Sequence, residues 1–97
     1  MKYVVVYIEN LSKLSPTRTS ISCVDHGDAE QTALAVVQSR PTHNLVVEMG
    51  DVITVNERRF LVEADNTLTE MESDEYKYYK SIDPKERIFR WFSWAIQ

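Results

Sequence analysis

The run from Tyr3 to Ile8 limits most strongly what this chain can fold into. Its residues are all apolar or aromatic, and most are β-branched, which is the composition of a β-strand. Because no polar residue interrupts the run, it predicts a central strand that is buried on both faces. The chain must therefore build a sheet around this segment.

A second strand is predicted over Thr19 to Val24, where apolar and polar residues alternate. Ile21 and Cys23 would point to one face of the sheet, and Ser20 and Ser22 to the other. A polar, proline-containing loop joins the two runs, so the second strand is expected to lie antiparallel to the first.

Capping residues mark where the helices begin. Asp28 stands three residues before a glutamine, a variant of the capping box, and Arg40 followed by Pro41 marks the end of that helix. The sequence Asp83-Pro84-Lys85-Glu86 places an N-cap acceptor before a proline at the first helical position. A shorter helix capped by Ser73 is expected just before it.

Between the first helix and Asp65, short apolar runs separated by turn residues predict three further strands, over 44–49, 52–55 and 59–64. From Asp65 onward the pattern is helical. The predicted fold is α+β, a small antiparallel sheet of about four to five strands with one helix after the second strand and two C-terminal helices. A length of 97 residues corresponds to a single globular domain over 1–97.

Residues that could ligate a metal or act as a nucleophile gather at Cys23, Asp25 and His26. A structural zinc site needs about four ligands, and His43 lies far along the chain. Two glycines in total exclude a glycine-rich phosphate loop. We therefore expect no metal, no cofactor and no enzymatic activity, and we rank last a small enzyme built on the three clustered residues. The single cysteine forms no internal disulfide and suits the cytoplasm.

The formal net charge of −4 conceals an uneven distribution. Residues 1–24 carry +2, residues 25–75 carry −9 and residues 76–97 carry +3. The total argues against a general nucleic-acid-binding protein, because such domains carry a basic surplus. The acidic middle of the chain, residues 25–75, is the more informative feature.

Two interpretations of this acidic middle stay open. The carboxylates either keep a small protein in solution or imitate the phosphates of a nucleic acid. On a strand, Glu63 and Asp65 would lie about 6.6 Å apart, similar to neighbouring phosphates. An apolar anchor, Phe89 or Trp94, would strengthen binding to a basic groove. The candidate partner-binding residues are Asp25, Asp28, Glu30, Glu63, Asp65, Glu70, Glu72, Asp74 and Glu75.

The C-terminal segment supports a different hypothesis. Basic residues alternate with aromatic residues over 76–94, a pattern that can stack and hold bases. Ile88, Trp91, Phe92 and Ala95 share one helical stripe and are expected to pack on the sheet instead. The alternative function is therefore a small nucleic-acid- or protein-binding accessory module that uses this basic aromatic end.

The whole chain, from MKYVVVYIEN through DHGDAEQ to RIFRWFSWAIQ, resembles the anti-CRISPR proteins of the type I-F group, in particular the subgroup that mimics DNA. The resemblance implies a phage- or prophage-encoded, non-enzymatic inhibitor that blocks target-DNA binding by the type I-F surveillance (Csy) complex. Its partners would be Cas proteins, the large subunit and the adjacent backbone subunit, in the host bacterial cytoplasm. We expect a monomer that contacts no membrane and does not itself bind DNA.

Overall fold

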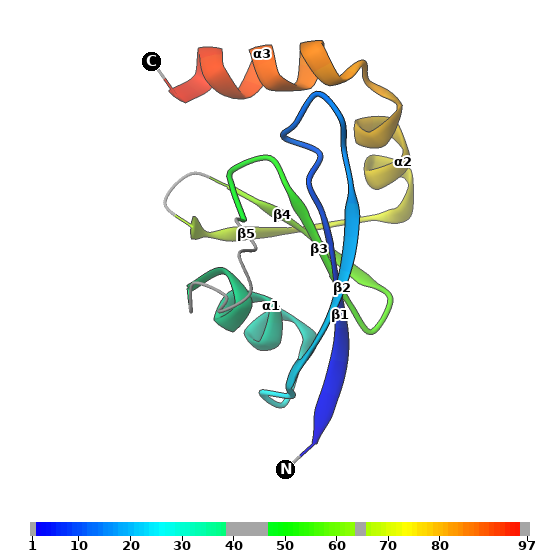
Figure 1. The fold of residues 1–97 in the computed structure, drawn as a ribbon, viewed down its shortest axis with the longest axis vertical. Helices are drawn as coiled ribbons and strands as arrows, with labels where there is room; N and C mark the ends of the chain where they lie inside the picture. The colour runs from blue at the N-terminus through cyan, green and yellow to red at the C-terminus, as the bar shows by residue number, and fades with distance from the viewer. Residues whose placement is uncertain (1, 39–46, 64–65, 96–97) are drawn as a thin grey trace.

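The structure is a computed structural model that describes residues 2–38, 47–63 and 66–95, with side chains described as far as Arg90. It confirms the predicted α+β fold, a five-stranded antiparallel sheet with one helix after the second strand and two C-terminal helices (Figure 1). The elements are β1 (Tyr3–Glu9), β2 (Arg18–Val24), α1 (Ala29–Gln38), β3 (Val52–Val55), β4 (Arg58–Val62), β5 (Leu68–Met71), α2 (Ser73–Ser81) and α3 (Pro84–Ala95). The strand order is β2-β1-β3-β4-β5.

Alternation along the strands divides the sheet into a covered face and an open face. Every second residue of β1 points to α1, so Val6 and Ile8 are fully buried, together with Phe60 of β4. From α1, Ala33 and Val36 complete this core. Ile21 and Cys23 of β2 pack against it as predicted, while their neighbouring serines are exposed.

The prediction that β1 is buried on both faces is wrong. β1 lies inside the sheet, between β2 and β3, but α1 covers only one of its faces. Tyr3 is therefore 66% exposed and Val5 50% exposed on the open face. A continuous apolar run identifies a strand, but the number of layers packed on it depends on where the helices go.

The last three strands differ in part from the prediction. β3 matches its predicted run. β4 spans Arg58–Val62 rather than the predicted 59–64, because the Glu63 N–H donates to the Thr67 carbonyl oxygen outside the strand, and residue 64 lies outside the described residues. Residues 47–49 form no strand, and residues 44–46 of that predicted strand lie outside the described residues. β5 was predicted as helical sequence, because Leu, Glu and Met are good helix formers. It becomes a strand by pairing with β4, and as an edge strand it leaves Thr69 and Glu70 exposed.

The helix starts lie close to the predicted positions. The Asp28 carboxylate accepts a hydrogen bond from the Gln31 backbone N–H at 2.8 Å, and Asp83 accepts one from the Lys85 N–H at 2.9 Å. α2 is capped one residue earlier than predicted, by Glu72 rather than Ser73. Arg40 and Pro41, predicted to end α1, lie outside the described residues.

Buried Asp51 connects two loops at one end of the sheet. Its fully buried carboxylate accepts hydrogen bonds from the Asn10 side chain at 3.0 Å, the Ser12 N–H at 3.1 Å and the Glu48 N–H at 2.9 Å. Asp51 therefore joins the β1–β2 loop to the turn that precedes β3.

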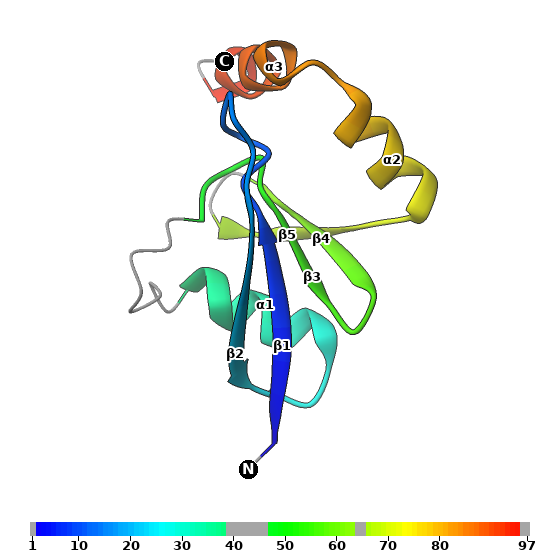
Figure 2. The same cartoon turned by 45° about the vertical axis from the view of Figure 1, so that its right-hand side comes forward.

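Buried Arg87 holds the C-terminal helices in place. Its guanidinium donates to the carbonyl oxygen of Leu11 in the β1–β2 loop and to those of Tyr79, Lys80 and Ile82 at the end of α2. Figure 2 shows α2 and α3 at the end of the sheet opposite the N-terminus, well away from α1. Arg87 therefore connects the end of α2 and the start of α3 to the β1–β2 loop.

Candidate functional site

Two acidic segments that are separate in the sequence meet at Arg58. Its guanidinium donates to both carboxylate oxygens of Glu70, at 2.9 and 2.7 Å. These hydrogen bonds raise the pKa of Arg58, and the charges of Glu70, Asp28 and Glu30 raise it further. The hydrogen bond from Arg58 also lowers the pKa of Glu70. The start of α1 and the edge strand β5 therefore share one electrostatic environment.

The exposed carboxylates on this side define what we call the acidic edge. It runs from the start of α1 across β5 to the first turn of α2 and comprises Asp28, Glu30, Glu70, Glu72, Asp74 and Glu75. Several of its members also have local roles, since Asp28 caps α1, Glu70 pairs with Arg58 and Glu75 accepts a hydrogen bond from the Glu72 N–H at 3.2 Å.

The other predicted partner-binding residues lie elsewhere or are not described. Asp25 accepts a hydrogen bond from the Gly27 N–H at 2.9 Å and shapes the turn before α1. Glu63 follows the end of β4, so the expected strand spacing to Asp65 does not apply to it, and Asp65 lies outside the described residues. Phe89 is 67% exposed and lines a shallow pocket with Leu14, Lys85 and Ile88. The Trp94 side chain is not described, and neither are the Trp91, Phe92 and Ala95 side chains of the predicted stripe.

The cluster around Cys23 has no geometry that favours chemistry. Within the described ranges, no group of three His, Cys, Asp or Glu residues is placed to hold a metal ion. Burial of the Cys23 thiol, and then the charge of Asp25, raises its pKa, whereas an activated nucleophile needs a lowered one. The backbone N–H of His26 donates to Thr32, and His43 lies outside the described residues.

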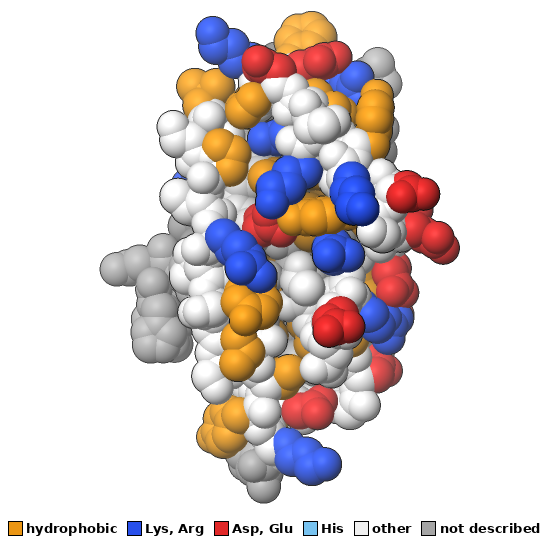
Figure 3. Space-filling model, turned by 90° about the vertical axis from the view of Figure 1, so that its right-hand side faces the viewer, with side chains coloured by type: hydrophobic (Ala, Val, Ile, Leu, Met, Phe, Trp, Pro, Cys, Tyr) orange, Lys and Arg blue, Asp and Glu red, His pale blue; other side chains and the backbone are white. Residues whose placement is uncertain are grey.

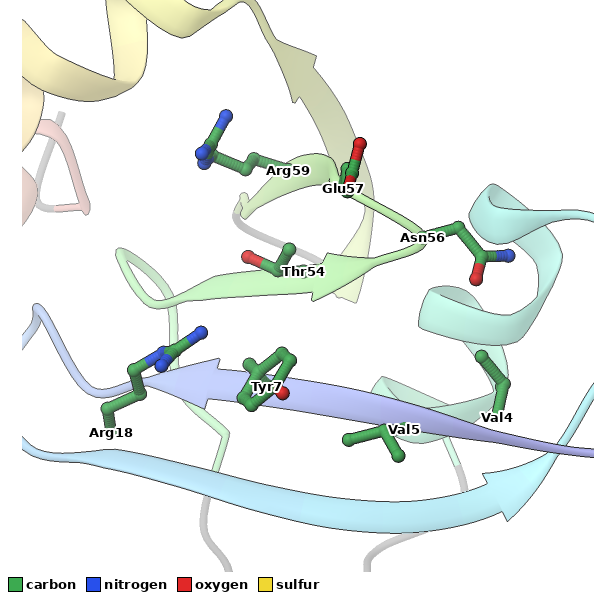
Figure 4. A pocket seen from close by; sticks show the side chains of 8 residues that line it. All are labelled: Val4, Val5, Tyr7, Arg18, Thr54, Asn56, Glu57 and Arg59. Carbon is green, nitrogen blue, oxygen red and sulfur yellow. The ribbon is translucent and has the colours of Figure 1, made fainter.

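The open face of the sheet carries a site that the sequence reasoning missed. The strand register places Tyr7 opposite Thr54, and Thr54 opposite Arg59, so the three side chains form a row across β1, β3 and β4. This row crosses an open pocket of about 590 Å³ (Figure 4). Its lining residues are Val4, Val5, Tyr7, Arg18, Thr54, Asn56, Glu57 and Arg59.

Two arginines lie against tyrosine rings on this face. The guanidinium carbon of Arg18 lies 3.9 Å from the centroid of the Tyr7 ring, and that of Arg59 lies 4.4 Å from the Tyr76 ring. In Figure 4 both guanidinium groups lie at one end of the pocket, with Asn56 and the valines at the other. The pocket therefore has a cationic end and a less charged end.

Buried Glu9 attaches α2 to the open face. The Tyr76 hydroxyl donates to Glu9 Oε1 at 2.6 Å, and Lys80 Nζ lies 3.4 Å from Glu9 Oε2. Burial raises the pKa of Tyr76, and the hydrogen bond to Glu9 raises it further. The contacts of Tyr76 with Arg59 and Lys80 extend the cationic surface from the sheet onto α2.

The space-filling view from this side shows how the two kinds of charge separate. Basic side chains gather around hydrophobic ones in the middle of the face, while most acidic side chains lie around them, at the top, along the right-hand edge and in the lower part (Figure 3). The side chains that make up the open face are those of Val5, Tyr7, Arg18, Thr54 and Arg59 on the sheet and of Tyr76 and Lys80 on α2.

No family model, curated protein or solved structure matches this chain. None of the described helices is long and apolar enough to cross a membrane. The two surfaces of this chain that could bind a partner are therefore judged from their own geometry, namely the acidic edge and the open face.

Arg59 shows why the open face was missed. Arg59 lies within residues 25–75, whose net charge of −9 gave no sign of a cationic site. Arg18 lies 41 residues before Arg59 in the chain. The available signal was the alternation of Tyr3, Val5 and Tyr7 in β1, which places three large side chains on one face once a single covering helix is assumed.

Proposed function

We propose that this chain is a non-enzymatic binding protein that recognises an anionic partner through its open face. One observation carries this proposal, namely that Arg18 and Arg59 stack on tyrosine rings beside an open pocket while their charges stay unpaired. Among the described residues, neither arginine forms an ion pair, whereas Arg58 and Arg90 each pair with a glutamate. A guanidinium that stacking holds in place is ready to make bidentate hydrogen bonds to a phosphate or carboxylate.

The local charge of the open face matters more for this partner than the total of −4. Exposed charges act over about 8–10 Å at moderate salt, so a ligand on the open face responds mainly to the charges beside it, which include Glu57 of the pocket lining as well as Arg18 and Arg59. Affinity should then come from a few well-placed cations, and it should fall as salt is added.

We expect the double variant R18Q/R59Q to elute from immobilised heparin, a polyanion, at clearly lower salt than the parent protein. Each lost cation contact should lower the salt dependence of binding by about one unit of slope. The matched control is R58Q/R90Q, which removes the same charge from arginines already paired with glutamates. Equal elution of the two double variants, or no retention of the parent protein, would contradict the proposal.

The acidic edge favours a second candidate function, the DNA mimicry implied by the resemblance. Asp28, Glu30 and Glu70 come together around Arg58 although 40 residues separate Glu30 from Glu70 in the sequence. Such an array would suit the basic DNA-binding groove of a protein partner. The resemblance makes Cas subunits of the type I-F surveillance complex the first partners to test.

We expect the triple variant D28N/E30Q/D74N to lose the ability to displace labelled target DNA from a purified type I-F surveillance complex. Asparagine still caps a helix, so α1 should remain intact while three negative charges are lost. The control E48Q/E57Q/E86Q removes three exposed carboxylates from other places and should still compete. Full competition by D28N/E30Q/D74N, or no competition by the parent protein, would exclude this mimicry.

A further inference from the structure

We infer that the partner of the open face is single-stranded nucleic acid, with one nucleotide seated in the pocket between Tyr7 and Arg59. This inference rests on the proposed function. It narrows the partner from any anionic molecule to single-stranded DNA or RNA. It departs from the expectation, drawn from the net charge of −4 and implied by the resemblance, that the chain does not bind DNA.

The size of the pocket suits a nucleotide. Its volume of about 590 Å³ falls inside the range of about 300–1,000 Å³ that small-molecule sites occupy. Tyr7, Thr54 and Arg59 lie on three successive strands, so the row that they form spans about 10 Å at the usual strand spacing. Because all three side chains project from strands rather than loops, the site is already formed before a ligand arrives.

The two ends of the pocket differ in the way that the two ends of a nucleotide differ. At one end lie the guanidinium groups of Arg18 and Arg59, which suit a phosphate (Figure 4). Toward the other end lie the half-exposed side chain of Val5 and the amide of Asn56. An apolar surface with a nearby donor and acceptor is what an unstacked base requires.

Glu57 adds a reason for this orientation. Its carboxylate lines the pocket and would repel a phosphate, but it can accept hydrogen bonds from the amino groups of a base. Asn56 and Glu57 form the tight turn between β3 and β4, with φ values of 49° and 66°, so their positions on the rim are set by the hairpin.

The open face extends beyond one nucleotide. Arg59 stacks on Tyr76, and Lys80 Nζ lies 5.6 Å from the same ring, with 55% of its side chain exposed. A strand whose phosphate lies between Arg18 and Arg59 would therefore pass close to Lys80 on α2, which also pairs with buried Glu9. Alternating aromatic and cationic groups of this kind bind single strands without strong sequence preference.

Other polyanions fit the open face less well. An acidic protein surface supplies carboxylates, but it does not place a flat ring beside each anionic group as a nucleotide does. A duplex presents its phosphates but keeps the faces of its bases stacked inside, so it would use the arginines alone. A single strand exposes both its phosphates and its base faces.

The test is fluorescence anisotropy at about 50 mM salt with a labelled 12-nucleotide single strand, as DNA and as RNA. We expect the single strand to bind more tightly than the corresponding duplex and than polyglutamate of equal charge. Tyr7→Ala should weaken binding of the single strand about 5- to 100-fold, because the pocket loses an aromatic ring and Arg18 loses the ring that holds its guanidinium in place. The matched control is Tyr3→Ala, which removes an exposed ring from the same strand and face but lies outside the pocket lining.

Tyr7→Leu provides a second variant in case Tyr7→Ala unfolds, since it keeps apolar contact with the sheet while removing the ring. Equal binding of duplex or polyglutamate, or no effect of either Tyr7 variant, would overturn the single-strand inference and leave the proposed anion-binding function standing. A free nucleoside monophosphate that competes as well as the oligonucleotide would overturn it in favour of a small-molecule site. If the parent protein binds none of these polyanions, both the single-strand inference and the proposed anion-binding function are wrong.

Discussion

Replacing Asp51 with alanine is expected to lower the free energy of unfolding by about 4 kcal/mol, a large part of the stability of a domain of this size. The carboxylate is fully buried and accepts hydrogen bonds from three donors, on Asn10, Ser12 and Glu48. Alanine would remove the acceptor that joins the two loops, and a donor left buried and unsatisfied costs about 1–3 kcal/mol. Urea unfolding followed by circular dichroism measures the change.

Two further variants identify the cause of the expected loss. Asp51→Asn keeps one acceptor oxygen, but its NH₂ group would face N–H donors that the second carboxylate oxygen now accepts. Its effect on the free energy of unfolding should therefore lie between those of the parent protein and Asp51→Ala. Asp74→Ala removes an exposed carboxylate from α2 and should change the free energy of unfolding by less than about 1 kcal/mol. If Asp51→Ala costs as little as Asp74→Ala, the Asp51 hydrogen bonds do not hold the loops together.

Arg87→Met is expected to loosen the junction of α2 and α3 with the β1–β2 loop and to cost about 3 kcal/mol, while the hydrogen bonds of Tyr76 and Tyr79 still connect α2 to the sheet. Methionine keeps the aliphatic stem, but it leaves the carbonyl oxygens of Leu11, Tyr79, Lys80 and Ile82 without their donor. The loss should be local, because none of the side chains described in α2 and α3, which extend as far as Arg90, belongs to the core cluster. Hydrogen exchange should show faster amide exchange in α2 and α3 and unchanged protection in β1, β3 and β4.

Arg90→Met is the matched control for Arg87→Met. Arg90 lies in the same helix but forms an ion pair with Glu86 that is exposed to solvent, so its loss should change stability little. Because α2 carries Tyr76 and Lys80, Arg87→Met should also weaken binding at the open face. Uniform loss of protection across the sheet would show that the helices and sheet unfold as one unit, contrary to this prediction.

The parts of the fold that depend on neighbouring residues in the sequence could be predicted. Asp28 and the Asp83-Pro84 pair mark helix starts because capping is a local interaction. The apolar runs of β1, β3 and β4 identify strands because their side chains need burial. β5 could not be predicted in this way, since its strand conformation comes from pairing with β4.

The candidate site was less predictable than the fold. The acidic segments were visible as charge runs, but their meeting at Arg58 depends on where β5 lies relative to α1. Tyr76 and Lys80 were recognised as part of a basic aromatic segment, whereas Tyr7, Arg18 and Arg59 were not assigned to any site. Those residues come from three separate strands. A sum of charges along the chain counts each arginine together with its sequence neighbours, so it does not show that the two arginines lie on one face.

By itself, the sequence determined that this chain is a small α+β domain in which a run of six apolar residues, Tyr3 to Ile8, forms a strand. The tertiary structure decided that only one face of that strand is covered. The physical reason is that burial favours a strand wherever apolar residues run together, while the covering of each face depends on the packing of distant helices. With α1 on one face and α2 reaching only one end of the other, Tyr7, Arg18 and Arg59 remain on the open face.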